Sequence, residues 1–486
     1  MRIEARFRDS VRHFPAKTAL VAGGRRLSYA DLDARSNRLA TALMRVGVEP
    51  GSRVVLLLDN DVEAVVSFLA TWKAGAVACP LYPAMKAEKL AGILTSIEPA
   101  AVILHARGLP TLLAAVTIAG TRPAIIATHL PEEAAQDSLR FEHLVAGDAV
   151  DALPVIADDS ELALLIHTSG STGRPKGVML SHANVDAACQ SILGYLENTC
   201  DDVVLSVLPL SFGYGITQMV TMAAIGGTLV LEKSFAFPRK ILDRLVEEEV
   251  TGFPMVPAMA ALIGGMKDLE PGFLPKLRYV TSAAAALPPA LSARLQELLP
   301  NSEIVVMYGQ TECLRVSFLP AAELARRPTS VGMAIPGTRA FVVDEDGQPA
   351  APGTIGQLVV EGPHVMLGYW GDDGNTQTTL EVTEHGRRLR TGDLFRTDAE
   401  GFLYFVSRTD DIIKTRGEKV SPQEVERVLY ALSGIREAAV AGVDDPIFGQ
   451  VVRAYVALEP GAVLSEKDII RHCAGQLEDY MVPKSV

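Results

Sequence analysis

Residues 168–177 read Thr-Ser-Gly-Ser-Thr-Gly-Arg-Pro-Lys-Gly and closely follow a short apolar run. Glycines let backbone N–H groups approach an anion, hydroxyl groups donate further hydrogen bonds, and Lys176 adds a positive charge. This combination predicts a loop that binds a polyphosphate, although clusters of Ser, Thr and Gly also form ordinary surface turns. The GxxxxGK[ST] pattern of P-loop NTPases is absent, because Pro175 stands five residues after Gly170. Composition leaves both interpretations, phosphate loop and turn, open.

Short apolar runs alternate with amphipathic stretches around this loop, from about residue 161 to residue 312. This alternation is typical of strands and crossover helices in a parallel sheet. We expect strands at 162–166, 203–208, 228–231, 252–256, 277–281 and 304–307, with helices at 183–196, 239–248 and 288–298. Four of these strands lead into loops of small or polar residues. Because ligands bind at the carboxyl ends of such strands, these loops should surround one site.

The rest of the chain extends this α/β pattern. A similar alternation precedes residue 77, and short strands with Gly and Pro turns follow residue 353. We therefore predict an α/β protein with a large N-terminal domain, residues 1–407, made of two α/β subdomains and a small β-rich subdomain. A small, mobile α+β C-terminal domain would occupy residues 408–486.

The composition excludes several classes of protein. The chain has 486 residues, of which 48% are hydrophobic and 21% charged, so an extensively disordered protein is not expected. A net charge of -13 argues against a nucleic-acid partner, and the five scattered cysteines suggest neither zinc nor disulfides. Without a signal peptide or a membrane-spanning apolar stretch, we expect a cytoplasmic protein.

Three further motifs follow the loop. They are Tyr308-Gly309-Gln310-Thr311-Glu312, Arg390-Thr391-Gly392-Asp393-Leu394 and Arg408-Thr409-Asp410-Asp411-Ile412-Ile413-Lys414. With all four motifs in this order, the chain resembles the adenylate-forming superfamily of acyl-CoA synthetases, peptide-synthetase adenylation domains and luciferases. The resemblance covers nearly the whole chain. It implies an enzyme that uses ATP and Mg²⁺ to convert a carboxylic acid into an acyl-adenylate and then into a thioester.

The resemblance implies roles for the first two motifs. Tyr308 would lie against the adenine, Thr311 would bond the α-phosphate, and Glu312 would ligate Mg²⁺. Gly309 and Gln310 would belong to the same cofactor-binding site. The implied catalytic residues are Thr311, Glu312 and Lys176. A carboxylate in the first turn of a helix would also explain Glu312. The β- and γ-phosphates would be held by Thr168, Ser169, Gly170, Ser171, Thr172, Gly173 and Lys176.

The later motifs are implied to bind the ribose and to move the C-terminal domain. Asp393 would accept hydrogen bonds from the ribose hydroxyls, with Arg408 on the same sugar, and Asp410 matches the hinge. Gly417 and Lys419 would face the second, thioester-forming half-reaction. Ordinary turns would also explain Asp393 and Lys419.

The acid-binding segment departs from the pattern of many relatives. Many acyl-CoA synthetases have histidine, and amino-acid-activating relatives aspartate, where this chain has Gly213. Because a buried ammonium needs a counter-charge, an α-amino acid should be a poor substrate, and we expect an apolar fatty or arylalkyl acid. The alanines near residue 284 could instead simply pack a strand against a helix. The expected acid-binding residues are Phe212, Gly213, Val256, Ala283, Ala284 and Met307.

The sequence does not identify the acceptor of the acyl group. The first interpretation is an acyl-CoA synthetase with free CoA as acceptor, and the second is an enzyme that loads the phosphopantetheine of an acyl carrier protein. The family's late motif ends at Pro483, after which a catalytic lysine should follow, and Lys484 is too early for that role. We expect this lysine soon after Val486. Without it, a nucleotide- or acyl-binding pseudoenzyme is a third interpretation.

Overall fold

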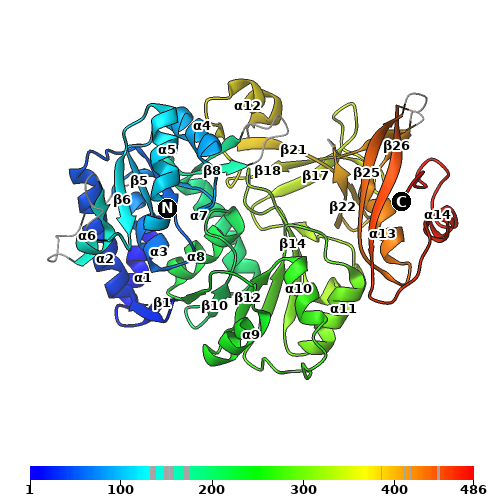
Figure 1. Cartoon of the computed structure of the whole chain (residues 1–486), viewed down its shortest axis with the longest axis horizontal. Helices are drawn as coiled ribbons and strands as arrows, with labels where there is room; N and C mark the ends of the chain where they lie inside the picture. The colour runs from blue at the N-terminus through cyan, green and yellow to red at the C-terminus, as the bar shows by residue number, and fades with distance from the viewer. Residues whose placement is uncertain are drawn as a thin grey trace. The chain divides into compact units, whose positions relative to one another are not determined.

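The computed structural model describes residues 1–131, 138–146, 153, 158–168, 175–384, 386–409, 411–415, 418–445 and 449–486, without the side chains of residues 414, 418 and 419. These residues form two compact units (Figure 1). The first unit comprises Met1–Arg339 and Glu361–Leu389, and the second comprises Ala340–Val360 and Arg390–Val486. The chain therefore changes unit after Arg339, Val360 and Leu389. The domain boundary expected between residues 407 and 408 stays a prediction.

The first sheet of the first unit has a parallel centre and antiparallel edges. Its described strands run in the order β16 (Met333–Ala334), β15 (Ser317–Leu319), β14 (Glu303–Tyr308), β13 (Tyr279–Ser282), β12 (Gly252–Met255), β10 (Val203–Ser206), β11 (Thr228–Leu231), β1 (Thr18–Ala22) and β2 (Arg25–Ser28). The six strands expected from the apolar runs include five of these, and the sixth belongs to the second sheet. The antiparallel hairpin of β14 and β15 was not predicted.

The second sheet of the first unit carries the start of the predicted phosphate loop. Its described strands run in the order β19 (Gly368–Tyr369), β9 (Lys176–Ser181), β8 (Leu162–Thr168), β4 (Val77–Pro80), β3 (Arg53–Leu57), β5 (Ala101–His105), β6 (Ala124–Thr128) and β7 (Leu139–Arg140). Strands β8 and β9 are antiparallel, with Thr168 opposite Lys176. The two ends of the predicted loop are therefore held side by side by the ladder.

Helices lie between the two sheets and on their outer faces. Helix α3 (Val62–Lys73) is buried along its whole length and contacts β1 of one sheet and β3 and β4 of the other. Helix α7 (His182–Tyr195) packs on β8 and β9, and the adjacent α8 (Gly213–Ile225) packs on β10 and β11. The remaining helices of this unit are α1 (Ile3–His13), α2 (Tyr29–Arg45), α4 (Ala87–Ile97), α5 (Leu109–Ala119), α6 (Phe141–Ala146), α9 (Pro238–Glu247), α10 (Pro257–Gly264), α11 (Pro289–Leu298) and α12 (Asp373–Thr379).

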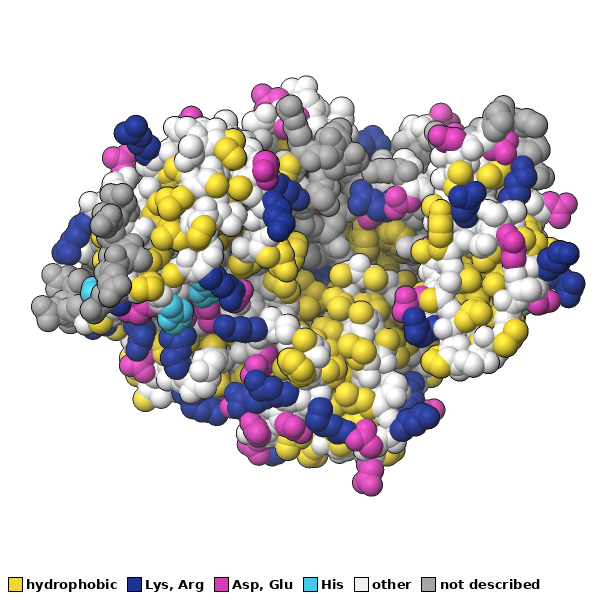
Figure 2. Space-filling view, in the orientation of Figure 1, with side chains coloured by type: hydrophobic (Ala, Val, Ile, Leu, Met, Phe, Trp, Pro, Cys, Tyr) yellow, Lys and Arg dark blue, Asp and Glu magenta, His cyan; other side chains and the backbone are white. Residues whose placement is uncertain are grey.

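The helix boundaries follow from local sequence signals. Ser181 and Asn184 form a capping box at the start of α7, so this helix begins as soon as β9 ends. Helix α9 buries Ile241, Leu242 and Leu245, and Figure 2 shows mixed positive and negative side chains over its outer side. This division into an apolar and a charged face is what the amphipathic pattern at 239–248 predicts.

The second unit is built mainly from strands. Strands β17 (Arg339–Val343), β18 (Gly356–Glu361), β21 (Gly386–Thr397), β20 (Leu380–Thr383) and β22 (Leu403–Arg408) form the sheet in which the chain changes unit. A further sheet has the order β24 (Glu418–Val420), β23 (Ile413–Thr415), β26 (Gly449–Leu458), β25 (Ile435–Asp445). Helices α13 (Pro422–Tyr430) and α14 (Glu466–Ala474) contribute Val425, Leu429 and Ile469 to its core. None of the described helices is both long and apolar enough to cross a membrane.

His182, the first residue of α7, is buried in the neutral form. Its Nδ1 accepts a hydrogen bond from the backbone N–H of Ile3 at 3.3 Å, and its side chain has no exposed surface. Burial, together with the nearby charge of Arg2, lowers the pKa of His182 from 6.5 to about 3. An unfolded histidine therefore binds a proton at a higher pH than His182 does in the folded protein.

Acidification should destabilise the protein through this group. As the pH falls below about 6.5, this histidine is protonated in the unfolded chain but stays neutral in the folded protein. The free energy of unfolding should therefore fall by about 2 kcal/mol between about pH 7 and pH 5. Urea unfolding at both pH values measures this loss. His182→Asn keeps an acceptor near Nδ1 and should reduce the pH dependence by that amount, whereas His13→Gln, at an exposed residue of α1, should leave it as in the wild type.

Candidate functional site

The candidate site of the first unit is centred on Tyr369, which the sequence did not single out. Its hydroxyl donates a hydrogen bond to Oε1 of Glu312 at 2.9 Å, and the Nζ of Lys176 lies 5.1 Å from the centre of its ring. The ammonium of Lys176 also donates to Oδ1 of Asn375 at 3.3 Å. One tyrosine thus contacts both the lysine of the predicted phosphate loop and the carboxylate of the second motif. These two residues, 176 and 312, are 136 positions apart in the sequence.

Strand pairing explains why Tyr369 reaches both groups. Strand β19 pairs antiparallel with β9, with Tyr369 opposite Val178, two residues from Lys176. The backbone N–H of Met366 donates to the carbonyl oxygen of Glu312 at 2.8 Å. Burial, and then the charge of Glu312, raise the pKa of Tyr369, so its hydroxyl stays a hydrogen-bond donor at neutral pH.

Glu312 has one carboxylate oxygen that makes no hydrogen bond with the described residues. Its Oε1 accepts the hydrogen bond of Tyr369, whereas its Oε2 accepts none from the described residues. Mg²⁺ in nucleotide enzymes is commonly held by one or two carboxylates together with phosphate oxygens and water. Among the described residues no group of three or more His, Cys, Asp or Glu side chains is arranged to hold a metal ion. A site of that shared kind would need only one carboxylate from the protein, which Glu312 could supply.

The second motif lies in the tight connection between β14 and β15, residues 309–316, which we call the return. The N–H of Val316 donates to the carbonyl of Tyr308 at 2.9 Å, and Gln310 Nε2 donates to the Tyr308 hydroxyl at 3.1 Å. A Cβ at Gly309 would lie 2.6 Å from the carbonyl oxygen of Leu314, closer than side chains approach backbone atoms. Glycine is therefore required at this position, and it keeps Thr311 and Glu312 within the return.

The predicted acid-binding residues fall into two sets. Ala283 and Met307 are buried, and the Tyr195 hydroxyl lies 3.1 Å from the sulfur of Met307. Gly213 begins α8, where a Cβ would lie 2.9 Å from Cδ2 of Leu314, so a larger residue at 213 would push the end of the Leu314 side chain aside. Val256 is partly buried, whereas Phe212 and Ala284 are exposed.

Asp393 and Arg408 are neighbours in the second unit. They lie opposite each other on β21 and β22, and Arg408 Nε is 3.8 Å from Asp393 Oδ1. Asp393 is buried, and its backbone N–H donates to the Thr391 hydroxyl at 3.1 Å. The two residues expected to contact the same ribose are therefore adjacent within this unit. Outside the described part of the chain lie the predicted residues Ser169, Gly170, Ser171, Thr172, Gly173, Asp410 and Gly417, and the side chain of Lys419.

Family models and relatives cover almost the whole chain. The family described as AMP-binding enzyme matches residues 7–370, and the AMP-binding enzyme C-terminal domain matches residues 424–486. The chain belongs to the AMP-binding enzyme family. Its membership confirms the superfamily predicted from the four motifs.

Individual relatives of this AMP-binding enzyme are similar over their length. A feruloyl-CoA synthase of an Amycolatopsis species is 34% identical over 475 residues, covering 97% of this chain and 92% of the relative. An indoleacetate–CoA ligase of Aromatoleum aromaticum is 30% identical, covering 97% and 91%. The crystal structure of ATP-bound MatB from Rhodopseudomonas palustris has a TM-score of 0.89 at 30% identity, covering 100% of this chain and 94% of that one. This similarity confirms the predicted α/β fold class.

Proposed function

We propose that this AMP-binding enzyme activates a carboxylic acid with ATP and transfers the acyl group to CoA. A carboxylate oxygen of the acid attacks the α-phosphorus of ATP, the bond from that phosphorus to the bridging oxygen breaks, and pyrophosphate leaves. The CoA sulfur then attacks the carbonyl carbon, the bond to AMP breaks, and the thiol proton is released. The observation that carries the proposal is that Tyr369 contacts both charged residues: Lys176 lies over its ring, and Glu312 accepts the hydrogen bond of its hydroxyl.

The residues of the candidate site match the charge requirements of the first step. Two anions must meet, and negative charge grows on the leaving pyrophosphate. Lys176 supplies a positive charge to the phosphates, and Glu312 Oε2 would hold Mg²⁺, which when bound neutralises phosphate charge. Thr311 would donate to the α-phosphate, and Asp393 with Arg408 would bind the ribose. Tyr308 would lie against the adenine, and Gly309 and Gln310 would belong to the same cofactor-binding site.

The acid is proposed to be arylalkyl or fatty. Relatives with substantial identity are named for ferulate and indoleacetate, both aromatic acids. In this chain Met307, Tyr195 and Phe318 form an apolar group, with the last two rings stacked at 4.2 Å between centroids. A group of this kind suits contact with an apolar acyl chain or ring. The supply of ATP and CoA that this reaction consumes supports a cytoplasmic location.

Product analysis tests the acceptor. The full-length protein is incubated with ATP, Mg²⁺, CoA and a panel of fatty and arylalkyl acids, and acyl-CoA is sought by mass spectrometry, with a parallel reaction containing holo-acyl carrier protein in place of CoA. We expect acyl-CoA with at least one acid. Acylated carrier protein without acyl-CoA would replace CoA by a carrier protein as acceptor, and AMP formation with neither product would contradict the thioester step.

Tyr369→Phe should impair adenylation by loosening Glu312. The ring that faces Lys176 stays, but the carboxylate loses its donor. A hydrogen bond to a charged group contributes about 1.5–3 kcal/mol, so we expect a fall of about tenfold or more in kcat/KM for adenylate formation. The Mg²⁺ concentration for half-maximal rate should rise as well. Tyr82→Phe, at an exposed residue of the same unit, is the control. Unaltered magnesium dependence in Tyr369→Phe would show that this hydrogen bond does not position Glu312.

A further inference from the structure

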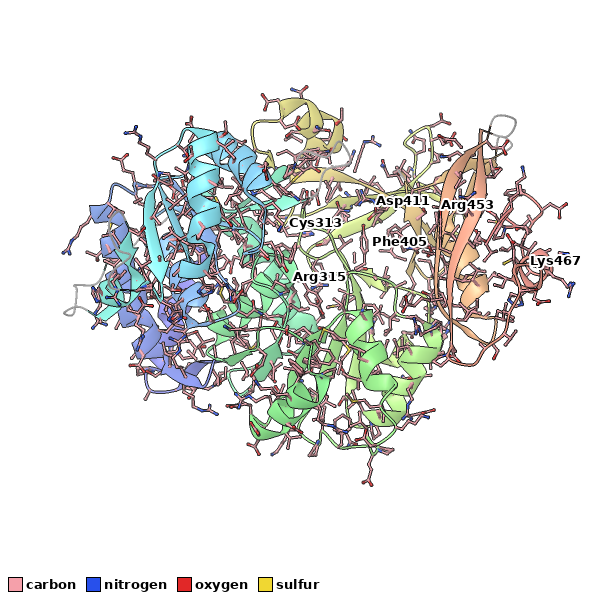
Figure 3. The ribbon with its side chains drawn as sticks, viewed as in Figure 1. Cys313, Arg315, Phe405, Asp411, Arg453 and Lys467 are labelled. Carbon is pink, nitrogen blue, oxygen red and sulfur yellow. The ribbon has the colours of Figure 1, made fainter. Side chains whose placement is uncertain are left out.

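Arg315 is a buried arginine that the adenylation chemistry above does not use. It lies three residues after Glu312 and only 2% of it is exposed. Its guanidinium stacks over the ring of Tyr214 at 5.1 Å, and Figure 3 shows it between α8 and β14. Burial raises the pKa of both Tyr195 and Tyr214, and the charge of Arg315 acts on both in the opposite direction. Arg315 therefore stacks on Tyr214 and lies close enough to Tyr195 for its charge to act on that hydroxyl.

The guanidinium of Arg315 has no counter-ion within the described residues. No ion pair or side-chain hydrogen bond is formed by it there, and its buried Nε has no partner. The other buried arginines of the described chain are paired, Arg2 with Glu4 and Glu161, and Arg327 with Glu323. Because a buried charge is costly without a partner, Arg315 is a position built to receive an anion.

Arg315 adjoins the segments expected to bind the acid. The side chain of its neighbour Leu314 lies next to Gly213. The ring of Tyr214, the residue after Gly213 in α8, packs against the guanidinium of Arg315. The Tyr214 hydroxyl is fixed 2.8 Å from Oγ1 of Thr281, at the end of β13. The hydroxyl of Tyr195 lies 3.1 Å from the sulfur of Met307. The unpaired cation thus lies beside an otherwise apolar and aromatic lining.

We propose that Arg315 determines specificity by binding a second carboxylate of the acid, so that the preferred substrate is a dicarboxylic acid. One carboxylate is activated by ATP, and the other meets the guanidinium, whose planar fork matches a carboxylate with two N–H···O bonds. The aromatic lining would contact the carbon chain or ring between the two groups. This inference rests on the proposed function and narrows its acid from arylalkyl or fatty to one that carries a second anionic group.

Matched pairs of acids test this proposal in acid-dependent ATP–pyrophosphate exchange. Glutarate, adipate, pimelate and suberate are compared with pentanoate, hexanoate, heptanoate and octanoate, and phenylenediacetate is compared with tolylacetate. A site with a buried group left unpaired rejects the analogue strongly, so the best diacid should exceed its monoacid partner by about 10²-fold or more in kcat/KM. Arg315→Met should lose about 10²-fold with the diacid and far less with the monoacid, which removes the preference. Arg12→Met, at an exposed residue, is the control.

The outcomes separate this inference from the proposed function. Equal use of diacids and monoacids by the wild type, or an equal loss of both in Arg315→Met, would overturn the inference, because Arg315 would then act on the reacting carboxylate, the nucleotide or the fold. Absence of exchange with every acid would instead overturn the proposed function. If Arg315→Met does not fold, Arg315→Lys should keep a reduced preference for the diacid. In thermal unfolding of the wild type, the best diacid should raise Tm more than its monoacid partner, and the reverse order would contradict the proposal.

Discussion

Glu312→Gln is expected to lower acid-dependent ATP–pyrophosphate exchange by about 10²- to 10³-fold, since removal of one electrostatic contact at a reacting phosphate has effects of this size. Glutamine keeps a carbonyl oxygen that can accept the hydrogen bond of Tyr369, so the return after β14 should keep its geometry. What is lost is the negative charge that would hold Mg²⁺. The measurement is the exchange rate across a magnesium titration, with thermal unfolding as a check on folding.

A matched control lies at the other end of the same strand. Glu303 begins β14 and is exposed, so Glu303→Gln removes one carboxylate from the same element without touching the candidate site. It should exchange at the wild-type rate. If Glu312→Gln also exchanges at that rate, with the same magnesium dependence, Glu312 is not the metal ligand and the proposed mechanism loses its cation site.

Gly309→Ala should be nearly as damaging, although it adds only a methyl group. The new Cβ would lie 2.6 Å from the Leu314 carbonyl oxygen and 2.9 Å from the Cα of Arg315, and both are backbone atoms that cannot rotate away. The return must therefore shift, and it carries Thr311 and Glu312 with it. Because a misplacement of about 1 Å can cost about 10²-fold in rate, we expect a loss of that order in exchange.

Gly194→Ala separates this effect from a general intolerance of alanine. Gly194 lies in α7 and has nothing within 4 Å of its virtual Cβ, so alanine should be neutral or slightly stabilising there. Exchange in Gly309→Ala is compared with Gly194→Ala at equal folded fractions. Full activity of Gly309→Ala would show that the return tolerates displacement, and that its backbone does not set the position of the reacting groups.

The local pattern of apolar residues was sufficient to predict most of the strands and helices that carry the motifs. The expected strand at 228–231 coincides with β11, and the expected helices at 239–248 and 288–298 differ from α9 and α11 by one residue at one or both ends. These elements are fixed by burial of their own apolar residues, which a window of the sequence contains. Strands β8 and β14, which lead into the first two motifs, were predicted for the same reason, although they end two residues and one residue later than expected.

Long-range pairing could not be predicted in this way. Tyr369 reaches Lys176 only because β19 joins the edge of β9, and nothing near residue 369 in the sequence indicates that partner. The hairpin of β14 and β15 was not predicted, because residues 309–316 contain no standard two-residue turn. Arg315 was overlooked because a single arginine is normally expected at the surface, whereas here it is buried and stacked on Tyr214.

Lys176, Tyr369 and Glu312 are proposed to form the phosphate-handling part of an acid-activating site. Acid-dependent ATP–pyrophosphate exchange by the full-length protein tests it most directly, with fatty, arylalkyl, dicarboxylic and amino acids as candidate substrates. We expect incorporation of labelled pyrophosphate into ATP with at least one fatty, arylalkyl or dicarboxylic acid, and its loss in Glu312→Gln. Silence with every acid, or exchange that survives in Glu312→Gln, would contradict it.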